Sequence, residues 1–143
     1  MKNIYKLLLI AMCAFSANTY ALTTKEAAEL FPVTITAIDE PKESYFNHVM
    51  IIHYEIENLS DKDVTAIESS IVFENPDGST FISLAANSLE IKSKSKANGQ
   101  FGYDFNKSNF TDKKMQLLGL KMKTWLKVKE IIYSDGTYEA VSD

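Results

Sequence analysis

The stretch from His48 to Asn58, reading HVMIIHYEIEN, constrains the fold of this chain more than any other. Large apolar side chains recur in it at every second position: Met50, Ile52, Tyr54 and Ile56. A period of two sends alternate side chains to opposite faces, which predicts a β-strand with one buried face. Burying four such side chains contributes roughly 6–10 kcal/mol, whereas ordering eleven residues costs about 15 kcal/mol. The strand therefore needs a sheet around it.

The first residues have the pattern of a secretory signal peptide. Lys2 and Lys6 precede an apolar run at 7–15, and Thr19-Tyr20-Ala21 provides the small residues of a cleavage site. The run is too short to span a bilayer as a helix. We therefore assign residues 1–21 to a signal peptide cleaved after Ala21 and residues 22–143 to a single domain, which is periplasmic or secreted.

The only cysteine, Cys13, lies inside this signal segment. As the first residue of a mature lipoprotein it would follow Met12, where such signals carry a small side chain, so we do not expect a lipid anchor. Cleavage after Ala21 leaves a domain without cysteine and hence without a disulfide. Such a domain depends on its hydrophobic core alone.

Charge is distributed unevenly along the chain. Residues 22–90 hold 3 lysines and 13 acidic residues, whereas residues 91–130 hold 10 lysines and 3 acidic residues. There is no arginine and the net charge is −4, which argues against nucleic-acid binding. Either basic strands neutralise acidic neighbours through cross-strand pairs, or a two-faced surface binds a charged partner; we favour the pairs.

Short strands separated by turn signals are expected along the rest of the chain. Thr23 and Glu26 form a capping box for a short helix that Pro32 ends. The expected strands are at 31–38, 64–74 (with Ile67, Ile71 and Phe73 on one face) and 79–84, then around Phe101, Tyr103 and Phe105, with a terminal hairpin at 131–141. The expected turns are Asn75-Pro76-Asp77-Gly78, Asn98-Gly99 and a two-residue turn at Asp135-Gly136.

Two lysine-rich stretches belong to this pattern. Lys92, Lys94 and Lys96 alternate and suit an edge strand protected against aggregation. A polar loop is expected at 106–114, and residues 114–130 fit either a helix or two strands. Gly119 and the β-branched Thr124 favour strands. The whole pattern indicates an all-β, immunoglobulin-like antiparallel β-sandwich with a short N-terminal helical turn.

Residues that carry chemistry are sparse. His48 and His53 lie five apart and so on opposite faces of one strand, where they cannot chelate one ion. Glu55 and Glu57 share a face with His53, which indicates a solvated surface rather than an acid–base pair. Residues 113–129 would suit an anionic membrane only as a helix. We predict no catalytic, cofactor-binding or metal-ligating residue and no membrane contact.

The stretch Ile56-Glu57-Asn58-Leu59-Ser60-Asp61-Lys62-Asp63-Val64, followed by Phe73-Glu74-Asn75-Pro76-Asp77-Gly78, is similar to small exported bacterial immunoglobulin-like domains of the FxLYD type. Ile132-Tyr133-Ser134-Asp135-Gly136-Thr137 looks like the closing hairpin of related families, although the Phe-x-Leu-Tyr-Asp signature itself is absent. This resemblance implies a fold and no catalytic site.

We therefore expect a non-enzymatic exported module that binds or helps to assemble another component of the bacterial cell envelope. Its partner would be a protein or another envelope component, held by an exposed edge strand. Two alternatives remain open at this point: an envelope hydrolase using a carboxylate pair, and a metal or small-ligand carrier using His53.

If the N-terminal assignment is right, the exported form begins at Leu22. N-terminal sequencing of the protein from the periplasm of an expressing Gram-negative host measures this directly. A form that retains Met1, or that begins at a lipid-modified Cys13, would contradict the assignment.

Overall fold

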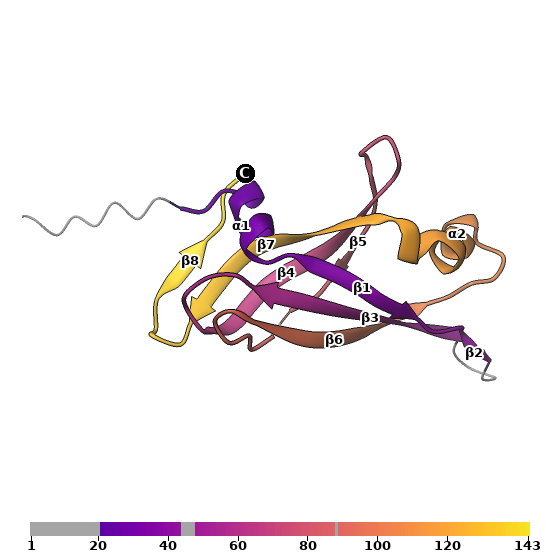
Figure 1. Cartoon of the computed structure of the whole chain (residues 1–143). Coiled ribbons are helices and arrows are strands. Elements are labelled where there is room, and N and C mark those ends of the chain that lie inside the picture. Colours follow the sequence, from indigo (N-terminus) through magenta and orange to yellow (C-terminus); the bar gives the residue numbers. More distant parts are fainter. Residues whose placement is uncertain (1–20, 44–47, 88) are drawn as a thin grey trace, which may run out of the picture.

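The computed structural model describes residues 21–43, 48–87 and 89–143, and these form two antiparallel sheets (Figure 1). In the first sheet, β3 (His48–Asn58) lies at the centre. On one side it pairs with β6 (Ser95–Asp104), and on the other side with β1 (Val33–Ile38) and β2 (Lys42–Glu43). β3 thus has the sheet that its apolar pattern requires.

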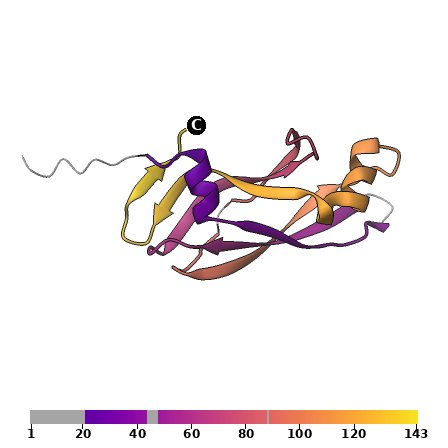
Figure 2. The same ribbon diagram turned by 45° about the horizontal axis from the view of Figure 1, so that its top comes forward.

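The second sheet has the strand order β5-β4-β7-β8. Its strands are β4 (Val64–Glu74), β5 (Thr80–Ala85), β7 (Lys123–Tyr133) and β8 (Tyr138–Ala140). The two sheets lie one over the other in both views (Figure 1, Figure 2), and apolar residues of both form one core. The predicted all-β, immunoglobulin-like antiparallel β-sandwich is therefore confirmed.

Two short helices lie toward opposite ends of the sandwich (Figure 1). α1 (Thr24–Leu30) begins with the predicted capping box, in which the Thr23 hydroxyl accepts from the Glu26 N–H and the Glu26 carboxylate accepts from the Thr23 N–H. It lies beside the C-terminus, where the Thr24 N–H donates to the Ser142 carbonyl. α2 (Phe110–Leu118) and the 3₁₀ turn η1 (Gly119–Lys121) lie at the other end, before β7.

The inner face of β3 is buried as predicted, and its members are Met50, Ile52, Tyr54 and Ile56. The inner face of β4 is also buried as predicted, with Ile67, Ile71 and Phe73. The aromatic side chains of β6 pack against the same core, and Phe105 just beyond the strand is buried. These elements confirm that period-two apolar faces build the core.

The two Asp-Gly hairpins have the same turn. The β4–β5 hairpin turns at Pro76-Asp77-Gly78 and the β7–β8 hairpin at Ser134-Asp135-Gly136. In each, the residue before the loop donates its N–H to the carbonyl of the residue after it, and the glycine has a φ of 82° or 81°. Both are three-residue loops that end in a left-handed glycine. The hairpins are confirmed, but the two-residue turn predicted at Asp135-Gly136 is wrong.

Asn58 holds the connection from β3 to β4. Its fully buried side chain donates to the carbonyls of Lys62 at 2.8 Å and Ile91 at 3.1 Å. Its side-chain oxygen accepts from the Ser60 N–H and hydroxyl at 3.0 and 2.7 Å. Because every polar atom of this side chain has a hydrogen-bond partner, these bonds compensate for the desolvation penalty of its burial. The Asn-x-Ser turn seen in the sequence is thus a folded unit.

The strand prediction for residues 114–130 is wrong in its first half. Residues Phe110–Leu118 form α2 and Gly119–Lys121 form η1, so the loop expected at 106–114 also ends early. The Asn109 side chain accepts from the Thr111 N–H and caps the helix, while Met115 is buried. The cap and this burial outweigh the short alternation that followed Leu120.

The predicted turn at Asn98-Gly99 is wrong as well, because both residues lie inside β6. Gly99 pairs with Tyr54 of β3, and a Cβ atom on Gly99 would overlap the Tyr54 ring. The glycine therefore serves close packing across two strands. The ring also contacts Phe101, with centroids 5.6 Å apart.

The predicted edge strand at Lys92, Lys94 and Lys96 begins later than expected. β6 starts at Ser95, and Lys94 has a φ of 54°, which breaks the extended chain. Only Lys96 of the three lies in a strand.

Gly99→Ala should destabilise the fold, because the new methyl group must displace the Tyr54 ring. We expect the free energy of unfolding to fall by about 1–3 kcal/mol, the usual cost of overpacking a core, in urea denaturation. Gly102→Ala is the matched control: Gly102 lies on the outer face of the same strand, where a Cβ would lie 3.0 Å from Val49 Cγ1. Equal losses in both variants would contradict this role of Gly99.

Candidate functional site

The two histidines do not share a site. His48 is exposed at the start of β3, whereas His53 lies on the outer face with its Nε2 3.0 Å from Asp39 Oδ2. Glu55, beside His53 on the same face, accepts a hydrogen bond from Lys96 Nζ at 2.8 Å instead. Within the described ranges, no three His, Cys, Asp or Glu side chains are grouped as metal ligands.

Glu55 and Glu57 lie on the outer face of β3, as their alternation predicts. Together they raise the pKa of Lys96, chiefly through the hydrogen bond to Glu55 and then through the charges of both carboxylates. This lysine between the two acidic residues fits the interpretation of a solvated, charge-balanced surface.

Cross-strand ion pairs balance much of the uneven charge. Pairs between the basic and acidic segments join β6 to β3 or β7 to β4: Lys96–Glu55, Lys123–Glu74 and Lys129–Glu68. The cross-strand interpretation is therefore confirmed for these strands. Exposed pairs of this kind contribute little net stability, so their main effect is on the surface potential.

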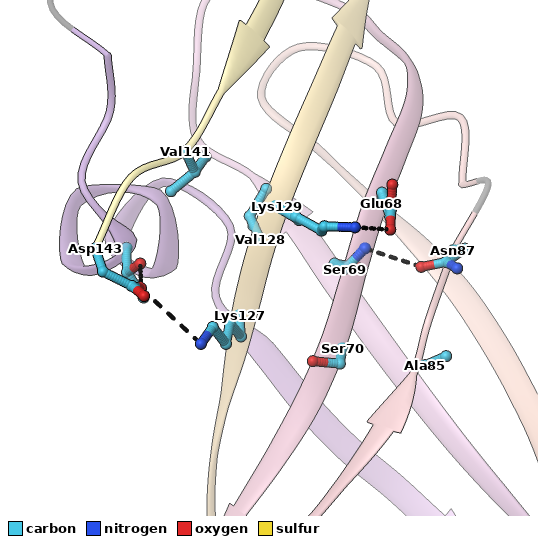
Figure 3. A pocket seen from close by; sticks show the side chains of 11 residues that line it. Glu68, Ser69, Ser70, Ala85, Asn87, Lys127, Val128, Lys129, Val141 and Asp143 are labelled. Carbon is cyan, nitrogen blue, oxygen red and sulfur yellow. Dashed lines mark hydrogen bonds and ion pairs between the residues drawn. The ribbon is translucent and has the colours of Figure 1, made fainter.

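A hollow of about 520 Å³ lies on the outer face of the second sheet, between β5, β4, β7 and the C-terminus (Figure 3). Lys129 Nζ lies 2.7 Å from Glu68 Oε1, and Lys127 Nζ lies 3.9 Å from Asp143 Oδ1. The hydrogen bond to Glu68 raises the pKa of Lys129, because it favours the ammonium form of the side chain. Two lysine–carboxylate pairs thus give the hollow alternating charges, whereas glycosidase-type chemistry uses two carboxylates that flank one bond.

A second hollow, of about 500 Å³, adjoins the first and shares Thr24 and Asp143 with it. The Thr24 hydroxyl donates to Asp143 Oδ1 at 2.9 Å. Trp125 lies in this hollow, and its Nε1 donates to Glu74 Oε1 at 2.8 Å. The sequence left residues 114–130 as a helix or strands and did not connect Trp125 with Glu74, since only the β4–β7 pairing brings them together.

One edge of the first sheet is free. The Phe105 N–H donates to the His48 carbonyl at 2.7 Å, so odd-numbered residues of β6 direct their backbone groups at β3. The backbone groups of the even-numbered residues therefore point away from the sheet, from Lys96 to Asp104. No other strand in the described part of the chain pairs with this side of β6.

A buried carboxylate attaches α2 to β6. Asp112 is 6% exposed and accepts from the Tyr103 hydroxyl at 2.6 Å and from the Asn106 N–H at 2.7 Å. Burial, and then the bond to Asp112, raises the pKa of Tyr103 to about 12. No sequence pattern pointed to this bond, because it joins a strand residue to a segment predicted as a loop.

By its fold, the protein is an immunoglobulin-like antiparallel β-sandwich. No family model matches the chain, and neither does any curated protein. Among solved structures, it is similar to one described as "X-ray structure of Northeast Structural Genomics Consortium target SoR45". The two are 10% identical, with 80% of this chain and 82% of that chain covered, at a TM-score of 0.36, too low to bear on function. No helix among the described residues has the length and apolar character to cross a membrane.

Tyr103 should make stability fall at alkaline pH. Its pKa is about 12 in the folded protein against 10.0 ordinarily, so the folded state keeps a proton that the unfolded state releases. The contribution is fully present below about pH 10 and is lost as the pH rises through about 12. Urea denaturation across this range should show a shallower decline for Tyr103→Phe than for the unchanged chain. Identical declines would contradict the shift.

Proposed function

We propose that this protein is a non-enzymatic exported module that binds another component of the bacterial cell envelope. It does so by accepting an extended segment of a partner protein at the free edge of β6. The observation that carries the proposal is the free edge itself: ten residues, Ser95–Asp104, pair with β3 on one side only among the described strands.

The composition of β6 suits strand addition. Edge strands that avoid pairing carry charges, proline or a covering element. β6 contains no proline and two charged residues, Lys96 and Asp104, and Lys96 is engaged by Glu55 across the sheet. A partner strand would gain main-chain hydrogen bonds along the whole edge.

Two of the three lysines expected to protect this edge, Lys92 and Lys94, do not lie on it. Lys92 Nζ lies 3.0 Å from Asp63 Oδ2, and Lys94 Nζ lies 3.1 Å from Asp61 Oδ1, both in the connection from β3 to β4. Their charges are therefore directed at their own chain, before β6 begins. The protection expected from three lysines is thus reduced to Lys96, which is paired with Glu55.

The export part of the proposal rests on the signal-peptide pattern of residues 1–21, which lies outside the described residues except for Ala21. The resemblance to exported FxLYD-type domains agrees with the same compartment, and it implies a fold and no catalytic site.

Gln100→Pro should abolish partner binding and leave the fold intact. The Gln100 N–H points to the free edge, so proline removes a donor that a partner strand needs but no bond within the sheet. Ala85→Pro is the matched control, because the Ala86 N–H bonds to the Ser69 carbonyl and Ala85 therefore faces the free edge of the second sheet.

The measurement is affinity capture of each tagged chain from the periplasm, with mass spectrometry of the bound component and thermal unfolding as the fold check. The unchanged chain and Ala85→Pro should recover one discrete component that Gln100→Pro loses. Recovery by a folded Gln100→Pro variant, or no component with the unchanged chain, would overturn the proposal.

A further inference from the structure

α2 and η1 form one end of the sandwich (Figure 1). Large apolar side chains are exposed there. Phe110 is 81% exposed, Leu117 is 73% exposed and Leu120 is 57% exposed. We call residues 107–121 the tip. Leu118 of the tip is 43% exposed, and the other large apolar side chains exposed in the described part of the chain are scattered outside the tip: Leu59, Ile132 and Tyr138.

Phe110 and Leu117 lie on the face of α2 that does not pack against the sandwich. The buried face of the helix and the turn after it carries Asp112, Met115 and Gly119. Phe110 and Leu117 lie seven residues apart, which is about two turns, so they project together from the opposite side. A surface helix normally turns its apolar residues inward. Packing within the domain therefore does not account for this pair.

Lysines surround the exposed apolar side chains. Lys107, Lys113 and Lys121 are exposed and form no ion pair with a described residue. The other lysines of the segment 91–130, apart from Lys114, are all ion-paired: Lys92, Lys94, Lys96, Lys123, Lys127 and Lys129. The uncompensated positive charge of a net acidic chain thus gathers at the tip.

Two of these lysines also converge on one hollow. The polar residues that line a recess of about 250 Å³ beside α2 are Lys107, Lys113, Gln116, His48 and one carboxylate, Glu40. Its ammonium and amide donors suit a phosphate group. Cationic donors therefore lie next to protruding apolar side chains.

We propose that the tip docks on an anionic phospholipid surface. Phe110, Leu117 and Leu120 enter the interface, and Lys107, Lys113 and Lys121 contact the phosphate groups around them. A planar interface fits a protruding end, since Phe110, Leu117 and Leu120 line none of the hollows described above and lysines flank them in the sequence. A phospholipid surface is complementary to the tip, because its apolar tails lie beneath anionic headgroups.

The proposal does not depend on strand addition at β6. It also replaces the sequence expectation of no membrane contact, which assumed strands where α2 and η1 are found. The tip binds a surface and does not cross it, in keeping with the short length of α2.

A site-specific label on the full chain tests the proposal. In a Cys13→Ser background, Leu117→Cys carries an environment-sensitive fluorophore, and Tyr138→Cys carries it at the opposite end as the matched control. Vesicles are either phosphatidylcholine alone or phosphatidylcholine with phosphatidylglycerol. The apolar N-terminal segment can enter both kinds of vesicle, so the comparison rests on label position and headgroup charge.

The label at position 117 should shift to shorter emission wavelengths with phosphatidylglycerol vesicles, and the label at position 138 should not. Lys113→Gln with Lys121→Gln should weaken this binding about fivefold for each lysine. Lys92→Gln with Lys94→Gln makes the same charge change away from the tip and should leave it unchanged. Thermal unfolding verifies that each variant folds.

Three results would overturn the proposal. One is no shift at position 117, as expected if the tip binds an acidic protein surface instead. Another is an equal shift at positions 117 and 138, or with both kinds of vesicle. The last is an equal loss of affinity in the two lysine double variants.

Discussion

The buried face of β3 is the constraint on which the structure depends. The strand pairs with β1 and β2 along one side and with β6 along the other, and its alternate side chains fill the space between the sheets. Tyr54 shows how tightly this is done, because its ring occupies the space that a side chain at position 99 would take. Asn58 then ends the strand with a satisfied buried network that directs the chain into the second sheet. A shift of the β3 register by one residue would turn its buried side chains, including Tyr54 and Asn58, to the solvent face.

Features that depend on neighbours in the sequence could be predicted. The alternation in β3 and β4, the capping box at Thr23 and the Asp-Gly hairpins each involve residues within a few positions, and all were confirmed. Features that depend on a distant partner could not. Gly99 reads as a turn signal until Tyr54 is known to face it, and the alternation around Leu120 reads as a strand until Met115 is seen to be buried. The attachment of α2 to β6 could not be predicted for the same reason, because the hydrogen bond from Tyr103 to Asp112 joins two segments that were predicted as separate units.

The positions of the charges in the fold are more informative than the net charge of the chain. Six of the ten lysines of the segment 91–130 are ion-paired, and three of these pairs are with acidic residues of neighbouring strands: Lys96–Glu55, Lys123–Glu74 and Lys129–Glu68. The four lysines of this segment that form no ion pair with a described residue all belong to the tip: Lys107, Lys113, Lys114 and Lys121. The same segment exposes Phe110 and Leu117. Unpaired lysines and exposed apolar side chains coincide there because packing and ion pairing within the domain involve neither.

The free edge and the tip are parts of one rigid arrangement. A short connection joins β6 to α2, and Asp112 of α2 accepts from the Asn106 N–H in that connection and from the Tyr103 hydroxyl in the strand. Because this carboxylate fixes α2 relative to β6, the direction of a strand added along β6 is fixed relative to any surface that the tip contacts. Figure 1 shows β6 running along the length of the sandwich toward α2. A protein segment bound at the edge would therefore be held at a fixed angle to a lipid surface bound at the tip. A flexible connection between β6 and α2 would leave that angle undefined.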